Sequence, residues 1–296
     1  MILSVSRRTD IPGCYPEWFM NRLRDKYVMT RNPMNFHQVS QINLSPDFIE
    51  CIVFWTKNAV PFMDYLEELN RMGYMYMFQY TITPYDNTLE KNISDKSDII
   101  KNVSEKIEKK RIVWRYDPIL LNDTYTVNRH IELFEEMCSL LYTAVNHVVI
   151  SFIDLYQKNR GYRLYELSTD EITHLAQAFG EIGAKYKLPI KTCCENYDLT
   201  KFGITKGACI DSVLLEEICN RPLLLKKATG QRKNCLCAES VDIGAYHTCL
   251  NGCIYCYATD YKRLKTKQKC YDKNSQILCD KLDFGKDIIK VRKMKK

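Results

Sequence analysis

Short apolar runs alternate with amphipathic stretches along this 296-residue chain, and this alternation constrains its fold more than any other feature. Runs such as Cys51–Trp55 and His147–Ile153 are almost continuously apolar, as strands buried on both faces are. Predicted strands cover Ile2–Ser6, Tyr27–Thr30, Cys51–Trp55, Tyr74–Ile82, Arg111–Tyr116, His147–Ile153 and Pro189–Thr192. Predicted helices cover Glu17–Leu23, Pro61–Arg71, Ser94–Lys109, Thr126–Thr143, Ser168–Lys187 and a short stretch ending at Cys219, while Phe36–Leu44 stays unassigned. The alternation predicts an α/β protein with a parallel sheet, as a full or partial TIM-like (β/α) barrel.

The chain is predicted to divide near Arg221-Pro222. Residues 1–220 would form the barrel, and residues 221–296 a cysteine-rich, basic extension packed on the barrel mouth and held by metal. No glycine-rich phosphate loop follows the first strand, which counts against a dinucleotide-binding fold.

The charge is unevenly distributed. From Arg221 onward there are 18 Lys and Arg against 7 Asp and Glu, whereas the first 220 residues carry 25 against 29. The basic run Lys286–Lys296 indicates either a nucleic-acid contact or a solvated tail. No apolar run approaches the roughly 20 residues of a membrane span, and the start is a poor signal peptide, so a cytoplasmic location is expected.

Cysteine is the most informative residue type. The chain has 14 cysteines, and eleven of them follow residue 190. In a cytoplasmic protein such a number of cysteines indicates metal binding or redox chemistry rather than structural disulfides. Cys249, Cys253 and Cys256 lie within eight residues, and soft thiolates at such spacing suit an iron–sulfur cluster, with zinc as the alternative. Three ligands would leave one iron of a cubane open.

The Cys-x3-Cys-x2-Cys spacing, with Tyr255 before the third cysteine, resembles the cluster loop of radical S-adenosylmethionine (radical SAM) enzymes. The resemblance implies a radical-SAM-like barrel in which Cys249, Cys253 and Cys256 hold a [4Fe–4S] cluster and Tyr255 lies near the adenine. It also implies that SAM is cleaved to a 5′-deoxyadenosyl radical, with electrons from a flavodoxin or ferredoxin. In most of that superfamily the loop follows the first barrel strand, whereas here it lies about five-sixths of the way along the chain.

Two other stretches, Ser6–Pro12 and Glu239–Tyr246, look like a bacterial family of unknown function. That family's C-terminal cysteine cluster has been likened to the radical SAM one. The resemblance covers most of the chain and supplies no substrate.

Polar residues follow the predicted strands, where barrel enzymes carry their sites. These strand-end residues are Arg7, Arg8, Asp10, Thr56, Lys57, Asn58, Gln79, Tyr80, Thr81, Arg115, Tyr116, Asp117, Ser151, Asp154, Cys194 and Glu195. If the resemblance holds, a cationic side chain would bind the SAM carboxylate through charge-assisted hydrogen bonds. The first candidate is Arg115, followed by Arg7 and Lys57. Asp117 or Glu195 would bind ribose hydroxyls, and Tyr80 or Tyr116 would shield the radical or relay hydrogen.

A second cysteine set comprises Cys194, Cys209, Cys235 and Cys237. It predicts an auxiliary iron–sulfur cluster, with zinc or unliganded thiols as rivals. Cys193 is an alternative to Cys194, since adjacent strand residues point to opposite faces. Cys270 and Cys279 have no assigned role.

Three functions follow. The first is a radical SAM-type enzyme that abstracts hydrogen from an unknown small-molecule or nucleic-acid substrate. The second is a zinc or iron–sulfur protein that binds nucleic acid through its basic, tyrosine-containing last quarter. The third is an electron-transfer protein without SAM chemistry.

Overall fold

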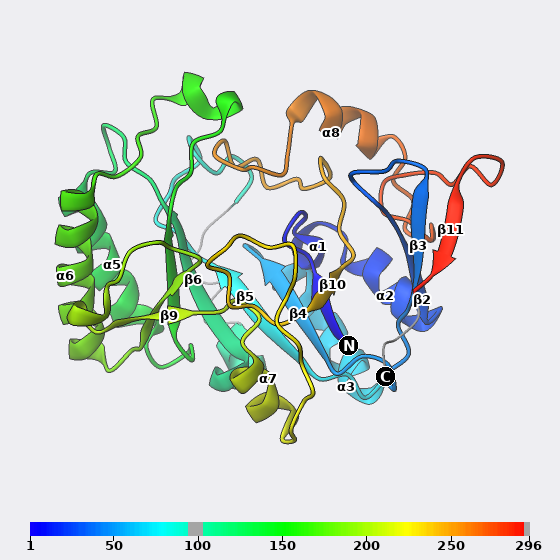
Figure 1. Cartoon of the computed structure of the whole chain (residues 1–296), viewed down its shortest axis with the longest axis horizontal. Helices are drawn as coiled ribbons and strands as arrows, with labels where there is room; N and C mark the ends of the chain where they lie inside the picture. The colour runs from blue at the N-terminus through cyan, green and yellow to red at the C-terminus, as the bar shows by residue number, and fades with distance from the viewer. Residues whose placement is uncertain (94–102, 293–296) are drawn as a thin grey trace. The chain divides into compact units, whose positions relative to one another are not determined.

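The computed structural model describes residues 1–93 and 103–292 (Figure 1). Contacts divide the chain into two compact units. The first unit comprises Met1–Met77, Ser240–Gly252 and Cys256–Lys296, and the second comprises Phe78–Glu239 and Cys253–Tyr255. This division differs from the boundary predicted near residue 221, because most of the last quarter belongs to the same unit as the N-terminal residues.

The described residues form an α/β fold with an eight-stranded sheet in the order β10-β1-β4-β5-β6-β7-β8-β9. Its strands are β1 (Ile2–Val5), β4 (Cys51–Thr56), β5 (Tyr76–Thr81), β6 (Ile112–Ile119), β7 (Val148–Phe152), β8 (Ile190–Cys193), β9 (Ile204–Gly207) and β10 (Ser240–Asp242). Neighbouring strands run parallel, as the apolar runs predict. The sequence did not predict β9 and β10, which are short and partly polar.

In the first unit, β1 lies between β10 and β4, with Leu3 in register with Val241 on one side and Ile52 on the other. Helices α1 (Ile11–Cys14) and α2 (Pro16–Arg24) follow β1, and η1 (Val60–Tyr65) and α3 (Leu66–Arg71) follow β4. The rings of Phe54 and Phe62 have centroids 4.8 Å apart, and both side chains are fully buried. The predicted helix Pro61–Arg71 is therefore present as a 3-10 turn that continues into an α-helix.

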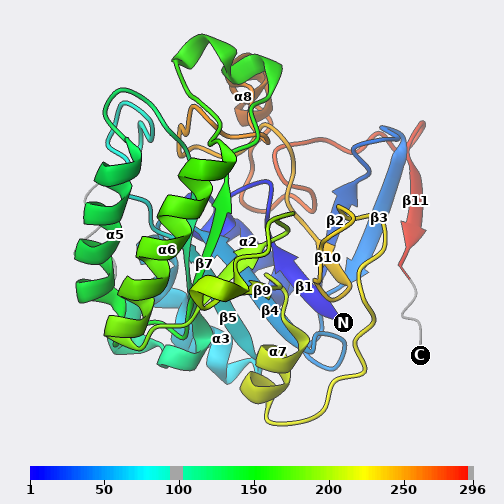
Figure 2. The same cartoon turned by 60° about the vertical axis from the view of Figure 1, so that its left-hand side comes forward.

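A separate three-stranded sheet belongs to the first unit, in the order β11-β3-β2 (Figure 2). Its strands are β2 (Tyr27–Arg31), β3 (Gln38–Asn43) and β11 (Ile288–Val291). The predicted strand at Tyr27–Thr30 is confirmed, although it pairs antiparallel with β3 rather than entering the main sheet. Four residues of the basic terminal run form β11, whose side chains are mostly exposed, and residues 293–296 of the run lie outside the described residues. The helix α8 (Tyr261–Gln268) precedes it in the chain.

In the second unit, α5 (Val127–Leu141) and α6 (Thr169–Tyr186) lie side by side (Figures 1 and 2). The rings of Phe134 and Phe179 stack with centroids 3.8 Å apart, and Trp114 of β6 stacks on Phe134. A capping box at Ser168 starts α6 where the sequence predicts it. The shorter elements are η2 (Lys109–Arg111), η3 (Gln157–Tyr162), η4 (Thr200–Phe202) and α7 (Ser212–Cys219).

The predicted helix Ser94–Lys109 falls largely on residues 94–102, which lie outside the described residues. Among the residues that are described, no helix is long and apolar enough to cross a membrane.

Candidate functional site

Asp242, the last residue of β10, fixes the backbone that follows β1 in the first unit. Its carboxylate accepts hydrogen bonds from the Ser6 hydroxyl at 2.5 Å, the Arg7 amide at 2.9 Å and the Gly244 amide at 3.0 Å. A carboxylate has about four acceptor positions, so one side chain satisfies several donors of two neighbouring turns. Arg7 and Arg8, both predicted site residues, therefore lie at the carboxyl end of β1.

Asp10 makes a second link at this end of the first unit. It is buried and accepts hydrogen bonds from the Gly13 amide at 2.8 Å, the Lys57 amide at 2.7 Å and the Asn251 amide group at 2.8 Å. Burial raises the pKa of the Asp10 carboxyl above its usual value. The ends of β1 and β4 are thus joined to the cysteine-bearing loop, although Asn251 lies 241 residues from Asp10.

Two of the three motif cysteines belong to the first unit. The Cys14 thiol, at the end of α1, donates to Asn251 at 3.7 Å and also contacts Cys249. The hydrogen bond with Cys14 and burial raise the pKa of the Cys249 thiol. Cys256 accepts a hydrogen bond from the Ala258 amide at 3.3 Å.

The third motif cysteine belongs to a segment, Cys253–Tyr255, that packs within the second unit. Cys253 forms a β-bridge with Glu90, and the Tyr255 hydroxyl donates a short hydrogen bond to the Glu90 carboxylate. Thr83 donates to the same carboxylate oxygen at 2.6 Å. Burial, and then Glu90, raise the pKa of the Tyr255 phenol. Glu90 is buried, and sequence reasoning missed it because nothing near it in the sequence marks it.

The ring of Tyr255 lies in an apolar cluster with Tyr85, Leu120 and Ile153. Its centroid is 5.7 Å from that of Tyr85. The predicted role of Tyr255 beside an adenine is untested, and the contacts give it a second role as an anchor of the motif.

Cys249, Cys253 and Cys256 form no disulfide, and each is partly exposed. Cysteine thiolates are the ligands that iron–sulfur clusters and many zinc sites take. Within residues 1–93 and 103–292, no three His, Cys, Asp or Glu side chains are gathered closely enough to hold a metal ion.

In the second unit, Arg115 on β6 is the centre of a polar cluster. Its guanidinium pairs with both oxygens of Asp117 and donates to Gln79 at 3.3 Å and to the Cys209 sulfur at 2.9 Å. The Ser151 hydroxyl donates to Asp117 at 3.3 Å. These residues come from β5, β6, β7 and the segment after β9, so the predicted convergence at the strand ends holds for them.

The second cysteine set divides into two groups. The Cys193 and Cys209 sulfurs are 2.7 Å apart, and Cys237 contacts Cys209. Cys194 follows β8 with φ of +61°, and the thiols with which it interacts electrostatically are Cys235 and, more weakly, Cys237. The alternative ligand Cys193 therefore takes the place predicted for Cys194 beside Cys209.

The thiols of this group differ in acidity. The hydrogen bond from Cys209 and the charge of Arg115 lower the pKa of Cys193. The same hydrogen bond raises the pKa of Cys209 to about 12. Glu195 accepts a hydrogen bond from the Phe152 amide at 3.0 Å, and burial raises the pKa of its carboxyl.

Tyr80 and Tyr116 lie on the opposite face of the sheet from Arg115. Tyr80 is in register with Trp114, whose ring packs on Phe134 of α5, and Tyr116 contacts the same helix. Side chains alternate between faces along a strand. Both tyrosines therefore pack under the helices and do not reach the polar cluster around Arg115.

The fold and these sites define an α/β protein with polar and cysteine side chains at the carboxyl ends of parallel strands. Residues 2–258 match the model of a family described as a domain of unknown function, DUF1848, and the chain belongs to that family. No curated protein matches the sequence.

Among solved structures, the chain is similar to a crystal structure from Bacteroides thetaiotaomicron described as "a putative alpha-L-fucosidase". The identity is 11%, the match covers 60% of this chain and 86% of the other, and the TM-score is 0.29. A likeness at this level carries no argument about function.

Proposed function

We propose that this protein is a radical SAM-type iron–sulfur enzyme built on a partial (β/α) barrel. One observation carries the proposal: the motif lies a few residues beyond β10, which is the edge strand of the parallel sheet and pairs with β1. In the enzymes that the motif resembles, the loop follows the first barrel strand. Here the loop comes late in the chain, but the strand that it follows, β10, is the first strand in the spatial order of the sheet.

In this proposal Cys249, Cys253 and Cys256 hold a [4Fe–4S] cluster. When bound, the cluster would supply the electron that cleaves SAM. The chain's own contribution is to hold the loop: Asn251 is bonded to Asp10, and Tyr255 to Glu90, so both ends of the motif are fixed.

Arg7 is better suited than Arg115 to bind the SAM carboxylate. Asp117 already occupies the guanidinium fork of Arg115. The guanidinium of Arg7 stacks 4.8 Å from the centre of the Trp55 ring, and no ion pair involves it among the described residues. The Arg7 carbonyl accepts a hydrogen bond from Tyr257 at 2.6 Å, which ties it to the residue after Cys256. Charge-assisted binding of a carboxylate therefore favours Arg7.

The test is anaerobic reconstitution with iron and sulfide, followed by dithionite and SAM. We expect about four irons per chain and formation of 5′-deoxyadenosine, detected by chromatography. Replacing Cys253 with Ser should abolish both, whereas Cys270→Ser, a partly exposed thiol of the first unit outside the motif, should retain both. Formation of 5′-deoxyadenosine by Cys253→Ser, or none by the iron-loaded wild type, would refute the proposal.

One observation favours the alternative of a metal-binding protein that acts on nucleic acid. Helix α8 has no fully buried residue and exposes Lys262, Arg263 and Lys265. Cations on an exposed helix attract phosphates, with an affinity that falls steeply with salt. Salt-sensitive binding of single-stranded RNA or DNA, lost when all three residues are replaced by Ala, would support this alternative, and binding unchanged in the triple variant would refute it.

A further inference from the structure

The contact between Cys193 and Cys209 points to redox chemistry separate from the proposed function. Cys193 ends β8 and is in register with Gly207 of β9, and Cys209 follows two residues later. Their sulfurs are 2.7 Å apart, well inside the roughly 3.5–4.0 Å of ordinary non-bonded contact between carbon atoms. Only a small movement separates such a pair from the ~2 Å of a covalent disulfide.

The two thiols differ in access. Cys193 is partly exposed, whereas Cys209 is 4% exposed. A small reagent therefore meets Cys193 first, and Cys209 lies behind it. This is the order of an attacking thiol and a resolving thiol.

A buried cation accompanies the pair. The Arg115 guanidinium donates to the Cys209 sulfur at 2.9 Å, and Gln79 donates to the Cys209 carbonyl at 2.7 Å. A cation beside a thiol stabilises the thiolate that attacks or leaves during exchange. The bond to the carbonyl holds the backbone of Cys209 in place.

We propose that Cys193 and Cys209 form a dithiol–disulfide couple that exchanges with small-molecule disulfides. The Cys193 thiolate attacks one sulfur of the small disulfide, which breaks and releases one thiolate. The Cys209 thiolate then attacks the Cys193 sulfur and releases the second. The protein dithiol is oxidised, the small disulfide is reduced to two thiols, and the two protein protons pass to the released thiolates.

The first experiment uses the wild-type chain and oxidised glutathione as the probe. The fully reduced protein is treated anaerobically, quenched with acid and mapped by mass spectrometry of its peptides. We expect a Cys193–Cys209 crosslink to form before any other, and a small dithiol to reverse it. A first crosslink between other cysteines would overturn the proposal, whether or not the chain binds a cluster at Cys249, Cys253 and Cys256.

The second experiment traps the intermediate. In Cys209→Ser the resolving thiol is missing, so Cys193 should accumulate one bound glutathione per chain. In Cys193→Ser both the crosslink and this adduct should be lost. The matched control is Cys194→Ser, which removes the adjacent thiol outside the Cys193–Cys209 contact and should leave the crosslink unchanged. Circular dichroism melts check that each variant is folded.

Metal analysis distinguishes a dithiol–disulfide couple from a metal site at these two cysteines. If the protein, purified without oxygen, carries zinc or a second set of irons that Cys193→Ser removes, and if Cys193 does not react with glutathione, these thiols are metal ligands. That result would overturn the dithiol proposal while leaving the proposed function intact.

Discussion

Glu90 is a buried carboxylate that bonds to side chains and backbone of its own unit. Its carboxylate accepts hydrogen bonds from the hydroxyls of Tyr255 and Thr83, and its backbone forms a β-bridge with Cys253. A buried acceptor that loses a donor keeps its desolvation penalty, so each bond here matters more than a surface one.

We therefore expect Tyr255→Phe to lower the free energy of unfolding by about 1–3 kcal/mol, as for a buried acceptor that loses its donor. The control is Tyr257→Phe, because Tyr257 is 47% exposed and water can replace its bond to the Arg7 carbonyl. Urea unfolding measures both variants. Equal losses in the two would contradict the assigned role of Glu90.

Two buried histidines make the stability depend on pH. His130 bonds to the Tyr116 hydroxyl and the Leu120 carbonyl, and burial lowers its pKa to about 4. Burial, with a smaller contribution from Lys191, also lowers the pKa of His147 to about 4.

The unfolded chain binds a proton at histidine near pH 6.5, whereas the folded chain does so only near pH 4. Stability from these groups is therefore complete above pH 6.5 and is lost as pH falls from 6.5 to 4, by about 3 kcal/mol per histidine. Urea unfolding at pH 7 and pH 4.5 should show a smaller pH dependence in His130→Gln than in wild type. His174→Gln, at an exposed position on α6, should keep the wild-type dependence.

At the scale of elements, η4 approaches α6 more closely than a side chain allows. A Cβ built on Gly180 of α6 would lie 2.0 Å from the carbonyl oxygen of Phe202. The absence of a side chain at Gly180 permits this contact.

Replacing Gly180 with Ala should therefore destabilise the second unit, although Ala is favoured over Gly in a helix by about 1 kcal/mol. Gly183→Ala provides the comparison. Its Cβ would lie 2.7 Å from the end of the Ile190 side chain, which can shift, and 3.1 Å from the nearest backbone atom, the Leu188 carbonyl oxygen. Thermal melts should give a lower Tm for Gly180→Ala than for Gly183→Ala. The reverse order would mean that η4 does not hold this position.

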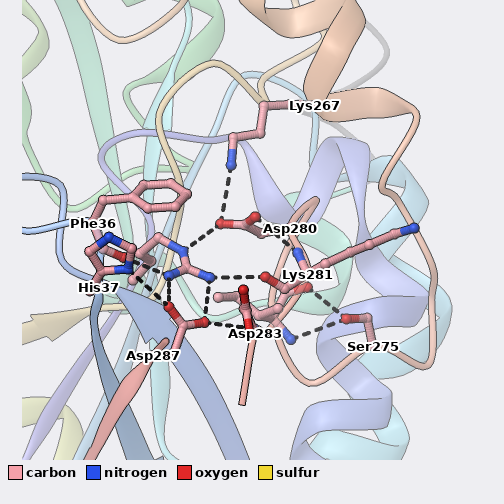
Figure 3. Close-up of polar contacts among 10 residues, drawn as sticks. Phe36, His37, Lys267, Ser275, Asp280, Lys281, Asp283 and Asp287 are labelled. Carbon is pink, nitrogen blue, oxygen red and sulfur yellow. Dashed lines mark hydrogen bonds and ion pairs between the residues drawn. The ribbon is translucent and has the colours of Figure 1, made fainter. Parts of the chain in front are cut away.

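At the scale of the whole chain, the C-terminal segment is fastened to the N-terminal part of the first unit. Arg31 at the end of β2 pairs with Asp280 at 2.8 Å and with Asp287 at 2.6 Å. Lys267 also pairs with Asp280 at 3.1 Å (Figure 3). The Arg31 guanidinium lowers the pKa of Asp287 to about 2. Arg31 thus joins β2 to the segment that leads into β11.

Because a lysine cannot reproduce the guanidinium fork, we expect Arg31→Lys to loosen this segment. Limited trypsin digestion should cut faster after Lys281 and Lys286 in this variant than in wild type. Arg24→Lys, which alters an exposed pair with Glu68, should leave the cutting rate unchanged. An unchanged rate in Arg31→Lys would show that the β11 pairing alone holds the segment.

The sequence by itself determined the fold class and most of the parallel strands. The runs at Cys51–Thr56 and Val148–Phe152 are apolar because both faces are buried, so local pattern and tertiary environment agree there. It also placed Arg115 and Asp117 at the end of one strand, and in the structure β6 continues to Ile119, so that both residues share a face.

Only the tertiary structure decided where the motif lies and which thiols meet. Three residues of β10 carry too little pattern to be recognised, and they become a strand because β1 supplies the hydrogen bonds. Strand β8 ends at Cys193, and Cys194 has a left-handed backbone with φ of +61°, so only the register with β9 decides that Cys193 meets Cys209. Glu90 gains Tyr255 as a partner from 165 residues away, and Asp10 gains Asn251 from 241 residues away, and no local pattern records such pairings.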